Sequence, residues 1–405
     1  MSRLNRVTVP LVLDTDIGSD VDDALALAFA LKHPDIDLRA VTTVADDVVL
    51  RAHIAHKLLA LAGRSGIEVA PGVGWIQSPS GRKSAWGHEG RGLIEPGEAA
   101  PSFARDGVSV LLEQTDVEIC TIGMQSNVAA AIERDSSFPE RVRRLDVMGG
   151  VFGPGVRPSR DHNLMVDPDA SLTALNAGIP AMYTPLDVTM NAPLPRTHLE
   201  ELRRGDDLCR ALARLVDVWI EVAEPKEDVA AIMHDPLTVA CIVDKRFVAT
   251  ERVPVTVAIH DGAVRTFIDR SAGHEAEVVT SVDASAFADF WLKTVLQSRS
   301  LRQSFDRPLQ TRSPSVSPDG RPKTGREEEG AMRKAIVVVT AALLSFGVMG
   351  FTHANAAVCA QTSTLAPVEA VVDGVLGGQA DVIFGVVNMI DGIALAPVGM
   401  TNFLC

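Results

Sequence analysis

Residues 9–23 read VPLVLDTDIGSDVDD, and this stretch decides the fold. Its first half is an aliphatic run rich in Val and Leu, which is typical of a buried β-strand. Its second half places five carboxylates within ten positions, where the strand should give way to a helix. These carboxylates belong to Asp14, Asp16, Asp20, Asp22 and Asp23. A buried strand that leads through an acidic turn into a helix is the opening unit expected of an α/β protein.

The alternation of strand-like and helix-like runs continues to about residue 300. Further buried strands are predicted at LRAVTTV (38–44), VEICTIG (117–123), RLDVMGG (144–150) and PAMYTPLD (180–187). Residues 22–33 and 48–63 carry apolar side chains at helical spacing, and Gly63 is a predicted helix end. The pattern predicts an open, mainly parallel sheet with helices on both faces.

The composition describes an acidic globular protein. Of the 405 residues, 38 are Lys or Arg and 52 are Asp or Glu, so the net charge is −14. This charge excludes a generally basic nucleic-acid binder, and an aromatic content of 4% argues against a stacking platform for single strands. Cys120, Cys209 and Cys241 lie in apolar contexts, which predicts core thiols in a reducing compartment.

The character of the sequence changes after residue 300. Residues 301–331 are rich in Ser, Pro, Gly and charge, and they are predicted to form a disordered polar linker. Residues 332–357 begin with Met-Arg-Lys, continue as a charge-free apolar run and end in small residues. This pattern resembles a secretory signal peptide or a short membrane anchor, and a buried core helix is the alternative.

The remaining residues, 358–405, form a small low-charge tail that is unrelated to the α/β part. Cys359 and Cys405 lie near its ends and could pair only if the tail were exported. We therefore predict a single functional domain in residues 1–300, and two joined reading frames explain the chain most simply. The localisation of the tail stays ambiguous, since it could be membrane-associated or exported.

The acidic turn predicts a cation site. In an open α/β sheet ligands bind at the carboxyl ends of the strands, where these acids converge. Five unpaired carboxylates would repel one another, and a bound cation removes that repulsion. Oxygen ligands without His or Cys favour Ca²⁺ or Mg²⁺ over zinc. Helix N-capping would account for one or two of the acids but not for five.

An Asp-x-Asp at the end of a strand also occurs in the haloacid-dehalogenase type phosphatases. In that group the position two residues after the second Asp is usually Thr or Val, whereas this chain has Gly18. A Mg²⁺-dependent phosphatase is therefore kept as an alternative.

Seven motifs that occur in order along the chain favour another family. They are DTDIGSDVDDALAL (14–27), TTVADD (42–47), GHEG (87–90), IGMQSN (122–127), MGG (148–150), HNLMVDP (162–168) and HDP (234–236). Together they resemble the calcium-dependent nucleoside hydrolases of the inosine-uridine preferring type, from about residue 9 to residue 295. The resemblance implies an enzyme that cleaves ribonucleosides to ribose and free nucleobase with water activated by Ca²⁺, a reaction of purine or pyrimidine salvage.

The resemblance implies a metal centre built from four residues. Asp16, the second Asp of the opening motif, binds the metal and acts as base toward the attacking water. Asp23 and Asp235 are the other carboxylate ligands. Ile122 contributes its backbone carbonyl, so its apolar side chain is no objection.

The resemblance also implies contacts to the substrate. Asp22 and Asn163 hold the ribose hydroxyls, and Asp161 helps at the 5′ side. His88 lines the base pocket, while His234 lies toward the nucleobase and donates a proton to it.

The chain departs from the family pattern beside the ribose site. Asp46 and Asp47 stand where many relatives have Gly-Asn; Asp47 is still expected to accept a ribose hydroxyl, but Asp46 adds a side chain where a permissive backbone is expected. The opening motif also carries Ser19-Asp20-Val21 before the double Asp, where many members have a single residue. These differences leave the metal set intact and keep open a catalytically idle module that binds Ca²⁺ and ribose.

The implied partners are few. They are a small-molecule nucleoside and Ca²⁺, with no nucleic acid and no membrane for the hydrolase domain, which is expected in the cytoplasm. The family commonly forms dimers or tetramers, so a homodimer or homotetramer is expected. The preference for purine or pyrimidine bases has no readable code in the sequence.

Overall fold

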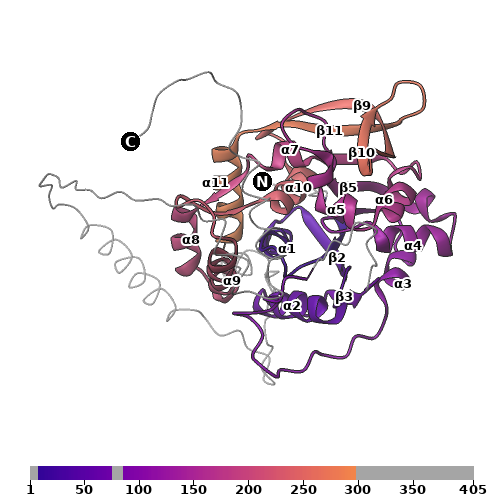
Figure 1. Cartoon of the computed structure of the whole chain (residues 1–405). Coiled ribbons are helices and arrows are strands. Elements are labelled where there is room, and N and C mark those ends of the chain that lie inside the picture. Colours follow the sequence, from indigo (N-terminus) through magenta and orange to yellow (C-terminus); the bar gives the residue numbers. More distant parts are fainter. Residues whose placement is uncertain (1–7, 75–84, 298–405) are drawn as a thin grey trace, which may run out of the picture. The chain divides into compact units, whose positions relative to one another are not determined.

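The computed structural model describes residues 8–74 and 85–297, which are organised around a nine-stranded sheet (Figure 1). The strand order is β10-β9-β11-β6-β5-β4-β1-β2-β3. The strands are β1 (Val9–Thr15), β2 (Ile36–Thr43), β3 (Glu68–Pro71), β4 (Val117–Thr121), β5 (Val142–Met148), β6 (Ala181–Thr184), β9 (Val248–His260), β10 (Ala263–Ile268) and β11 (His274–Val282). All pairings from β3 across to β11 are parallel, while β9 pairs antiparallel with β11 and β10. The predicted open, mainly parallel sheet is confirmed.

Side chains alternate between the two faces along each strand, so a strand that is apolar throughout presents apolar side chains on both faces. Helices cover both faces of this sheet. On β1, Leu11 and Leu13 belong to one apolar cluster, whereas Val12 belongs to another. The first cluster includes residues of α1, α9, α10 and α11, and the second includes residues of α3, α4 and α6. The helices are α1 (Asp22–Lys32), α2 (Val48–Leu61), α3 (Gly107–Leu112), α4 (Ser126–Arg134), α5 (His162–Val166), α6 (Pro168–Leu175), α7 (Leu186–Thr189), α8 (Arg196–Arg203), α9 (Asp207–Ala223), α10 (His234–Val243) and α11 (Ala284–Val295).

Smaller elements complete the described part of the chain. Short 3₁₀ helices span Phe138–Arg141 and Pro158–Arg160. A separate two-stranded antiparallel sheet joins β7 (Pro193–Pro195) to β8 (Val229–Ile232). It lies directly before α10, the helix that begins at His234.

The five strand-like runs quoted from the sequence correspond to β1, β2, β4, β5 and β6. Strands β3 and β9 to β11 are not among those runs, because β3 has only four residues and β9 alternates exposed and buried positions. The predicted helices at 22–33 and 48–63 are α1 and α2, and Gly63 follows α2 with a φ of 65°. Cys120, Cys209 and Cys241 are buried free thiols, as expected.

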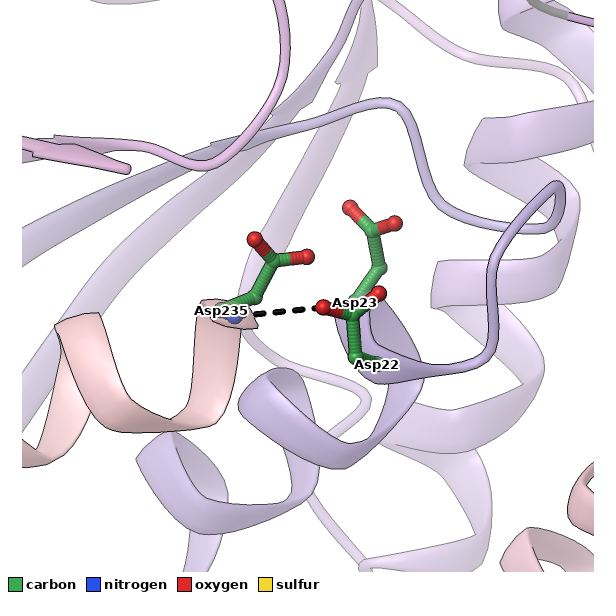
Figure 2. Close-up of side chains that lie close together, drawn as sticks. All are labelled: Asp22, Asp23 and Asp235. Atoms are coloured by element: carbon green, nitrogen blue, oxygen red, sulfur yellow. Dashed lines mark hydrogen bonds between the residues drawn. The ribbon is translucent and has the colours of Figure 1, made fainter. Parts of the chain in front are cut away.

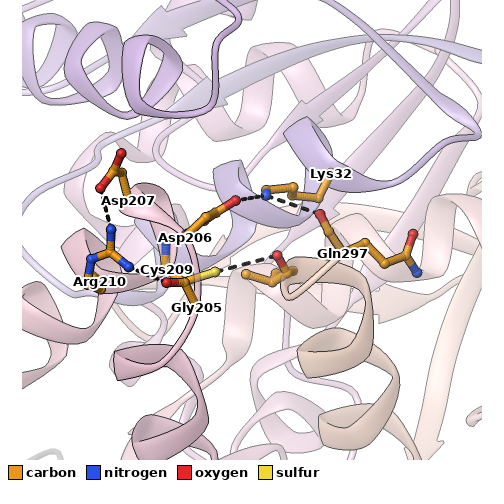
Figure 3. A network of polar contacts seen from close by, with 8 residues as sticks. Lys32, Gly205, Asp206, Asp207, Cys209, Arg210 and Gln297 are labelled. Carbon is orange, nitrogen blue, oxygen red and sulfur yellow. Dashed lines mark hydrogen bonds and ion pairs between the residues drawn. The ribbon is translucent and has the colours of Figure 1, made fainter. Parts of the chain in front are cut away.

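A polar network joins the ends of three helices (Figure 3). The Lys32 ammonium, at the end of α1, pairs with the Asp206 carboxylate before α9 and donates to the Gln297 carbonyl after α11 at 3.3 Å. Asp206 also caps α9 by accepting from the Cys209 N–H at 3.1 Å. Partial burial raises the pKa of Asp206, but the hydrogen bonds from Lys32 and Cys209 outweigh burial and bring it below the ordinary 3.8.

No helix within residues 8–74 and 85–297 is long and apolar enough to cross a membrane. The predicted linker (301–331), the signal-like or anchor-like segment (332–357) and the tail (358–405) lie outside the described residues. The characters assigned to these three segments therefore remain predictions.

Replacing Asp206 should destabilise the fold through Lys32. Asp206→Ala removes a helix cap and leaves a buried ammonium without its carboxylate, so the free energy of unfolding should fall by about 1–3 kcal/mol. Because the pKa of Asp206 is lowered in the folded state, the ionised carboxylate stabilises the fold. The loss of unfolding free energy in the variant should therefore have its full size above about pH 4, and it should shrink as the pH falls through that lowered pKa. Urea denaturation at several pH values measures it.

The matched control is Asp207→Ala. Asp207 is the neighbouring acid, but its partner, Arg210, is an exposed side chain one turn along the same helix. An exposed pair at this spacing contributes little, so the control should unfold almost as the wild type does. Equal losses for the two variants would contradict the role given to Lys32.

Candidate active site

Three buried carboxylates meet where α1 and α10 begin (Figure 2). Asp22 and Asp23 are the first residues of α1, and Asp235 is the second residue of α10. One oxygen from each lies within 4.8 Å of the others, and each residue is 3% exposed. The Asp235 N–H donates to Asp22 Oδ2 at 3.2 Å, which ties the two helix ends together. Segments more than 200 residues apart in sequence thus form one acidic cluster, the three-carboxylate cluster.

The cluster fits a divalent cation. Burial raises the pKa of Asp22, Asp23 and Asp235 well above the ordinary value, and repulsion from the neighbouring carboxylates raises it further. Such a charge excess is stable only with protons or a cation to offset it. An all-oxygen donor set of this kind suits a hard ion such as Ca²⁺ or Mg²⁺.

Asp16 lies beside this cluster, directly after β1. It is 7% exposed, and its charge acts on both Asp23 and Asp235. Burial raises the pKa of Asp16, the charge of Arg51 lowers it, and the charge of Asp46 raises it. The structure therefore brings Asp16 together with the three carboxylates predicted from the opening and closing motifs.

The loop after β4 approaches Asp16 closely because it contains a glycine. A Cβ at Gly123 would lie 2.8 Å from Asp16 Oδ1 and 2.9 Å from Asp16 N, so any other residue would displace this carboxylate. Gly123 belongs to the motif IGMQSN, and its close approach to Asp16 explains why this motif needs a glycine at that position.

Asp14 lies beneath the site, fully buried on β1. Its Oδ1 accepts from Thr42 Oγ1 at 2.5 Å and from Asn127 Nδ2 at 2.7 Å, while its Oδ2 has no hydrogen-bond partner in the described part of the chain. Burial raises the pKa of Asp14 to about 7. Asn127 also binds the Thr43 carbonyl and the Val73 N–H, so it joins the ends of neighbouring strands.

Asn163 and Ile122 are in direct contact. Asn163 Nδ2 donates to the Ile122 carbonyl at 3.0 Å and to the Met148 carbonyl at 3.1 Å. Both its donor hydrogens therefore have backbone acceptors, and Oδ1 is the atom through which Asn163 could bind a hydroxyl. The Ile122 carbonyl has a second lone pair, so its contact with Asn163 is compatible with the metal role that the resemblance implies.

Asp161 serves the backbone on both of its oxygens. Oδ1 accepts from the Leu164 N–H at 3.1 Å and so caps α5, while Oδ2 accepts from the Gly150 N–H at 2.6 Å. It is 2% exposed. The structure thus gives Asp161 a part in shaping the MGG turn, and a contact at the 5′ side remains a prediction.

His234 is buried at the start of α10 and held by Thr189. Its Nδ1 lies 2.7 Å from Thr189 Oγ1, and the residue is 6% exposed. Burial lowers the pKa of His234 to about 4, so the imidazole is uncharged at neutral pH. Thr189 was not predicted from sequence, because it lies 45 positions away and belongs to none of the seven motifs.

His88 lines a small pocket beside the acidic turn. The pocket is lined in part by Ser19, Asp20, Arg91, Leu215 and Trp219. His88 Nε2 lies 2.7 Å from the Ser19 carbonyl, and its ring centroid lies 6.3 Å from that of Trp219. This location is compatible with the predicted base pocket, although Nε2 already has a protein partner.

Of the two acids in the ADD turn, Asp46 is the more buried, and its charge acts on Asp16. Asp47 is exposed and caps α2 by accepting from the Leu50 N–H at 2.9 Å. Asp46 adopts a left-handed φ of 50°, and its buried Oδ2 has no partner among the described residues. Since the charge of Asp46 raises the pKa of Asp16, it lies within electrostatic range of the proposed base. The predicted ribose contact of Asp47 remains a prediction.

Comparisons with known proteins show which family the chain belongs to. The model of the inosine-uridine preferring nucleoside hydrolase family matches residues 11–289. The chain is 30% identical over 263 residues to the pyrimidine-specific ribonucleoside hydrolase RihA of Salmonella arizonae, a match that covers 60% of this chain and 82% of that protein.

Solved structures share the fold. A purine-preferring ribonucleoside hydrolase from Gardnerella vaginalis aligns with a TM-score of 0.60 and 24% identity, covering 71% of this chain and 98% of that one. The plant nucleoside hydrolase PpNRh1 aligns with a TM-score of 0.60 and 23% identity, covering 72% and 99%. With its family match over most of residues 8–297, this chain belongs to the inosine-uridine preferring nucleoside hydrolase family.

Proposed function

We propose that this chain hydrolyses the N-glycosidic bond of ribonucleosides, giving ribose and free nucleobase, with Ca²⁺ as its cofactor. The observation that carries the proposal is the three-carboxylate cluster beside Asp16, at the carboxyl edge of a family-matched sheet. Asp16, Asp23, Asp235 and the Ile122 carbonyl would hold the ion. The oxygen-only donor set and the mutual repulsion of the buried carboxylates support a calcium ion over a softer metal.

The reaction passes through a state in which the sugar becomes positively charged. When bound, Ca²⁺ supplies a Lewis acid that lowers the pKa of the attacking water. Asp16, which is buried directly after β1, accepts the proton of that water. Asp22 and Asn163 orient the ribose hydroxyls, and the surrounding carboxylates stabilise the cationic sugar.

The departing base needs a hydrogen-bond donor. His234 is uncharged at neutral pH, so it acts by donating an N–H to the leaving nitrogen rather than as an imidazolium. Thr189 keeps one ring nitrogen occupied and thereby orients the other. His88 and the pocket beside it would contact the base on the other side of the acidic turn.

The base preference, the assembly and the location of the protein are the more detailed parts of the proposal. RihA is named pyrimidine-specific and the Gardnerella vaginalis enzyme purine-preferring, so both classes of base need to be tested here. A cytoplasmic homodimer or homotetramer is proposed from the family resemblance alone. Turnover of inosine, guanosine, uridine and cytidine measures the base preference, and light scattering of the purified protein measures the assembly.

An idle binding module is the second candidate, because Asp46 adds a partly buried carboxylate within electrostatic range of Asp16. This module would bind Ca²⁺ and ribose without releasing base from any nucleoside. The phosphatase alternative would release phosphate from a phosphorylated substrate in the presence of Mg²⁺. One panel that follows free base, free phosphate and ribose binding separates all three functions.

Removing the proposed base should abolish turnover. Asp16→Asn keeps the size of the side chain but cannot accept the proton of water, so kcat should fall at least about 10²–10⁴-fold. Release of free base from inosine and uridine measures it, and circular dichroism checks the fold. Asp116→Asn makes the same change at an exposed residue that pairs with Arg143, and it should leave kcat unchanged. Wild-type turnover by Asp16→Asn would refute the assignment.

Removing the cation should abolish turnover and lower the Tm. After chelation the carboxylates repel one another, so added Ca²⁺ should restore turnover and raise the Tm. Asp235→Asn, which removes one ligand and one charge, should raise the Tm of the chelated protein while shrinking the increase caused by Ca²⁺. A Tm and a turnover that ignore both chelator and Ca²⁺ would contradict the metal site.

A further inference from the structure

Arg51 is a buried cation that none of the roles above uses. It lies on α2 and is 1% exposed, and of the Lys and Arg residues that the structure describes only Lys32, at 7%, falls among the buried ones with it. Burying a guanidinium is costly unless its donors are satisfied. Lys32 pairs with the Asp206 carboxylate, and Arg51 donates to backbone carbonyls and to a hydroxyl.

These contacts join two loops at the carboxyl edge of the sheet. Nη1 donates to the carbonyls of Asp16 and Ile17, the latter at 3.0 Å, and Nη2 donates to Ser19 Oγ at 3.1 Å. Nε donates to the Ala45 carbonyl at 2.9 Å. The acidic turn follows β1 and the ADD turn follows β2, and these two strands pair in parallel. One planar guanidinium therefore holds both turns beside the three-carboxylate cluster.

The geometry of the acidic turn depends on this anchoring. Beyond β1 the carbonyls of Asp16 and Ile17 turn toward the same side chain, and Gly18 then reverses the chain with a φ of 120°. A buried carbonyl needs a donor, and a guanidinium satisfies several at fixed angles, which an ammonium cannot do. The orientation of the Asp16 backbone, and with it the position of the Asp16 carboxylate, is therefore set from α2.

Ser19 extends the anchoring to a third segment. Its hydroxyl donates to Glu89 Oε1 at 3.1 Å, and its carbonyl lies 2.7 Å from His88 Nε2. Glu89 in turn accepts from the N–H groups of Trp86 and Gly87. The lengthened opening motif thus has a structural use, since Ser19 connects Arg51 with residues 86–89.

We propose that Arg51 is a positioning residue for the metal and base loop, acting on the cation through the backbone of residues 16–19. The inference rests on the proposed function, since it presumes a divalent cation at the three-carboxylate cluster. Losing a side chain that orients metal ligands typically weakens metal binding or activity by about 10–100-fold. Because Asp22 and Asn163 hold ribose independently of Arg51, KM for nucleoside should change far less than kcat.

The test compares Arg51→Met, Arg51→Lys and Ser19→Ala in the full-length chain. The dissociation constant for Ca²⁺ is measured by calorimetry on chelated protein, and kcat and KM are measured with the preferred nucleoside. Both Arg51 variants should weaken Ca²⁺ binding about 10–100-fold and lower kcat, because lysine keeps the charge but not the forked donors. Arg144→Met is the matched control, since Arg144 is a largely buried arginine that pairs with Glu118 on β4.

Wild-type Ca²⁺ affinity and kcat in folded Arg51→Met would overturn the proposal, as would full recovery in Arg51→Lys. If Arg51→Met does not fold, Ser19→Ala decides: weaker Ca²⁺ binding with lower kcat supports the proposal, and wild-type values overturn it. The two hypotheses remain distinguishable. The proposed hydrolase activity stands or falls on wild-type turnover, whereas the role of Arg51 is read from the ratio of variant to wild-type Ca²⁺ affinity.

Discussion

Like charges buried together are the constraint on which this structure depends. Asp22, Asp23 and Asp235 lie almost out of reach of solvent, within 4.8 Å of one another, and Asp16 adds its charge from the adjacent turn. Repulsion between like charges grows as the local dielectric falls, so the free-energy cost of these carboxylates rises as solvent is excluded from them. The same exclusion strengthens whatever positive charge enters the site. A cation, and then a sugar that becomes positive in the transition state, are the species that this constraint favours.

The surrounding fold limits the repulsion and holds the carboxylates in place. Asp22, Asp23 and Asp235 begin two packed helices, α1 and α10, whose N-terminal ends carry partial positive charge. Asp14 is held from β2 and α4, by Thr42 and Asn127. Arg51 fixes the turn that carries Asp16, and Ser19 connects that turn to residues 86–89. The carboxylates are therefore positioned by several elements together, α1, α2, α4, α10 and β2, which explains why the site needs the assembled α/β fold.

Much of the fold follows from local patterns. The buried parallel strands are continuous aliphatic runs that end in acidic or small residues, so β1, β2, β4, β5 and β6 could be predicted. Strand β3 has only four residues, and β9 to β11 mix buried with exposed positions, so they were not predicted. The site residues Asp16, Asp22, Asp23 and Asp235 were predicted from their motifs. Thr189 and Arg51 were not, because neither a lone threonine nor an arginine in an apolar helix carries a recognisable pattern.

The sequence by itself determined the family, the sheet class and the carboxylates that can hold a cation, because these depend on residue type and order along the chain. Only the tertiary structure decided which acids meet. It brought Asp235 to Asp22, which lies more than 200 residues earlier in the sequence. It placed Asp46 within electrostatic range of Asp16, whereas Asp47 caps a helix. It also buried His234 against Thr189, and this burial keeps the imidazole uncharged at neutral pH. Proximity, solvent exclusion and backbone direction set these outcomes, and all three arise only when distant segments pack together.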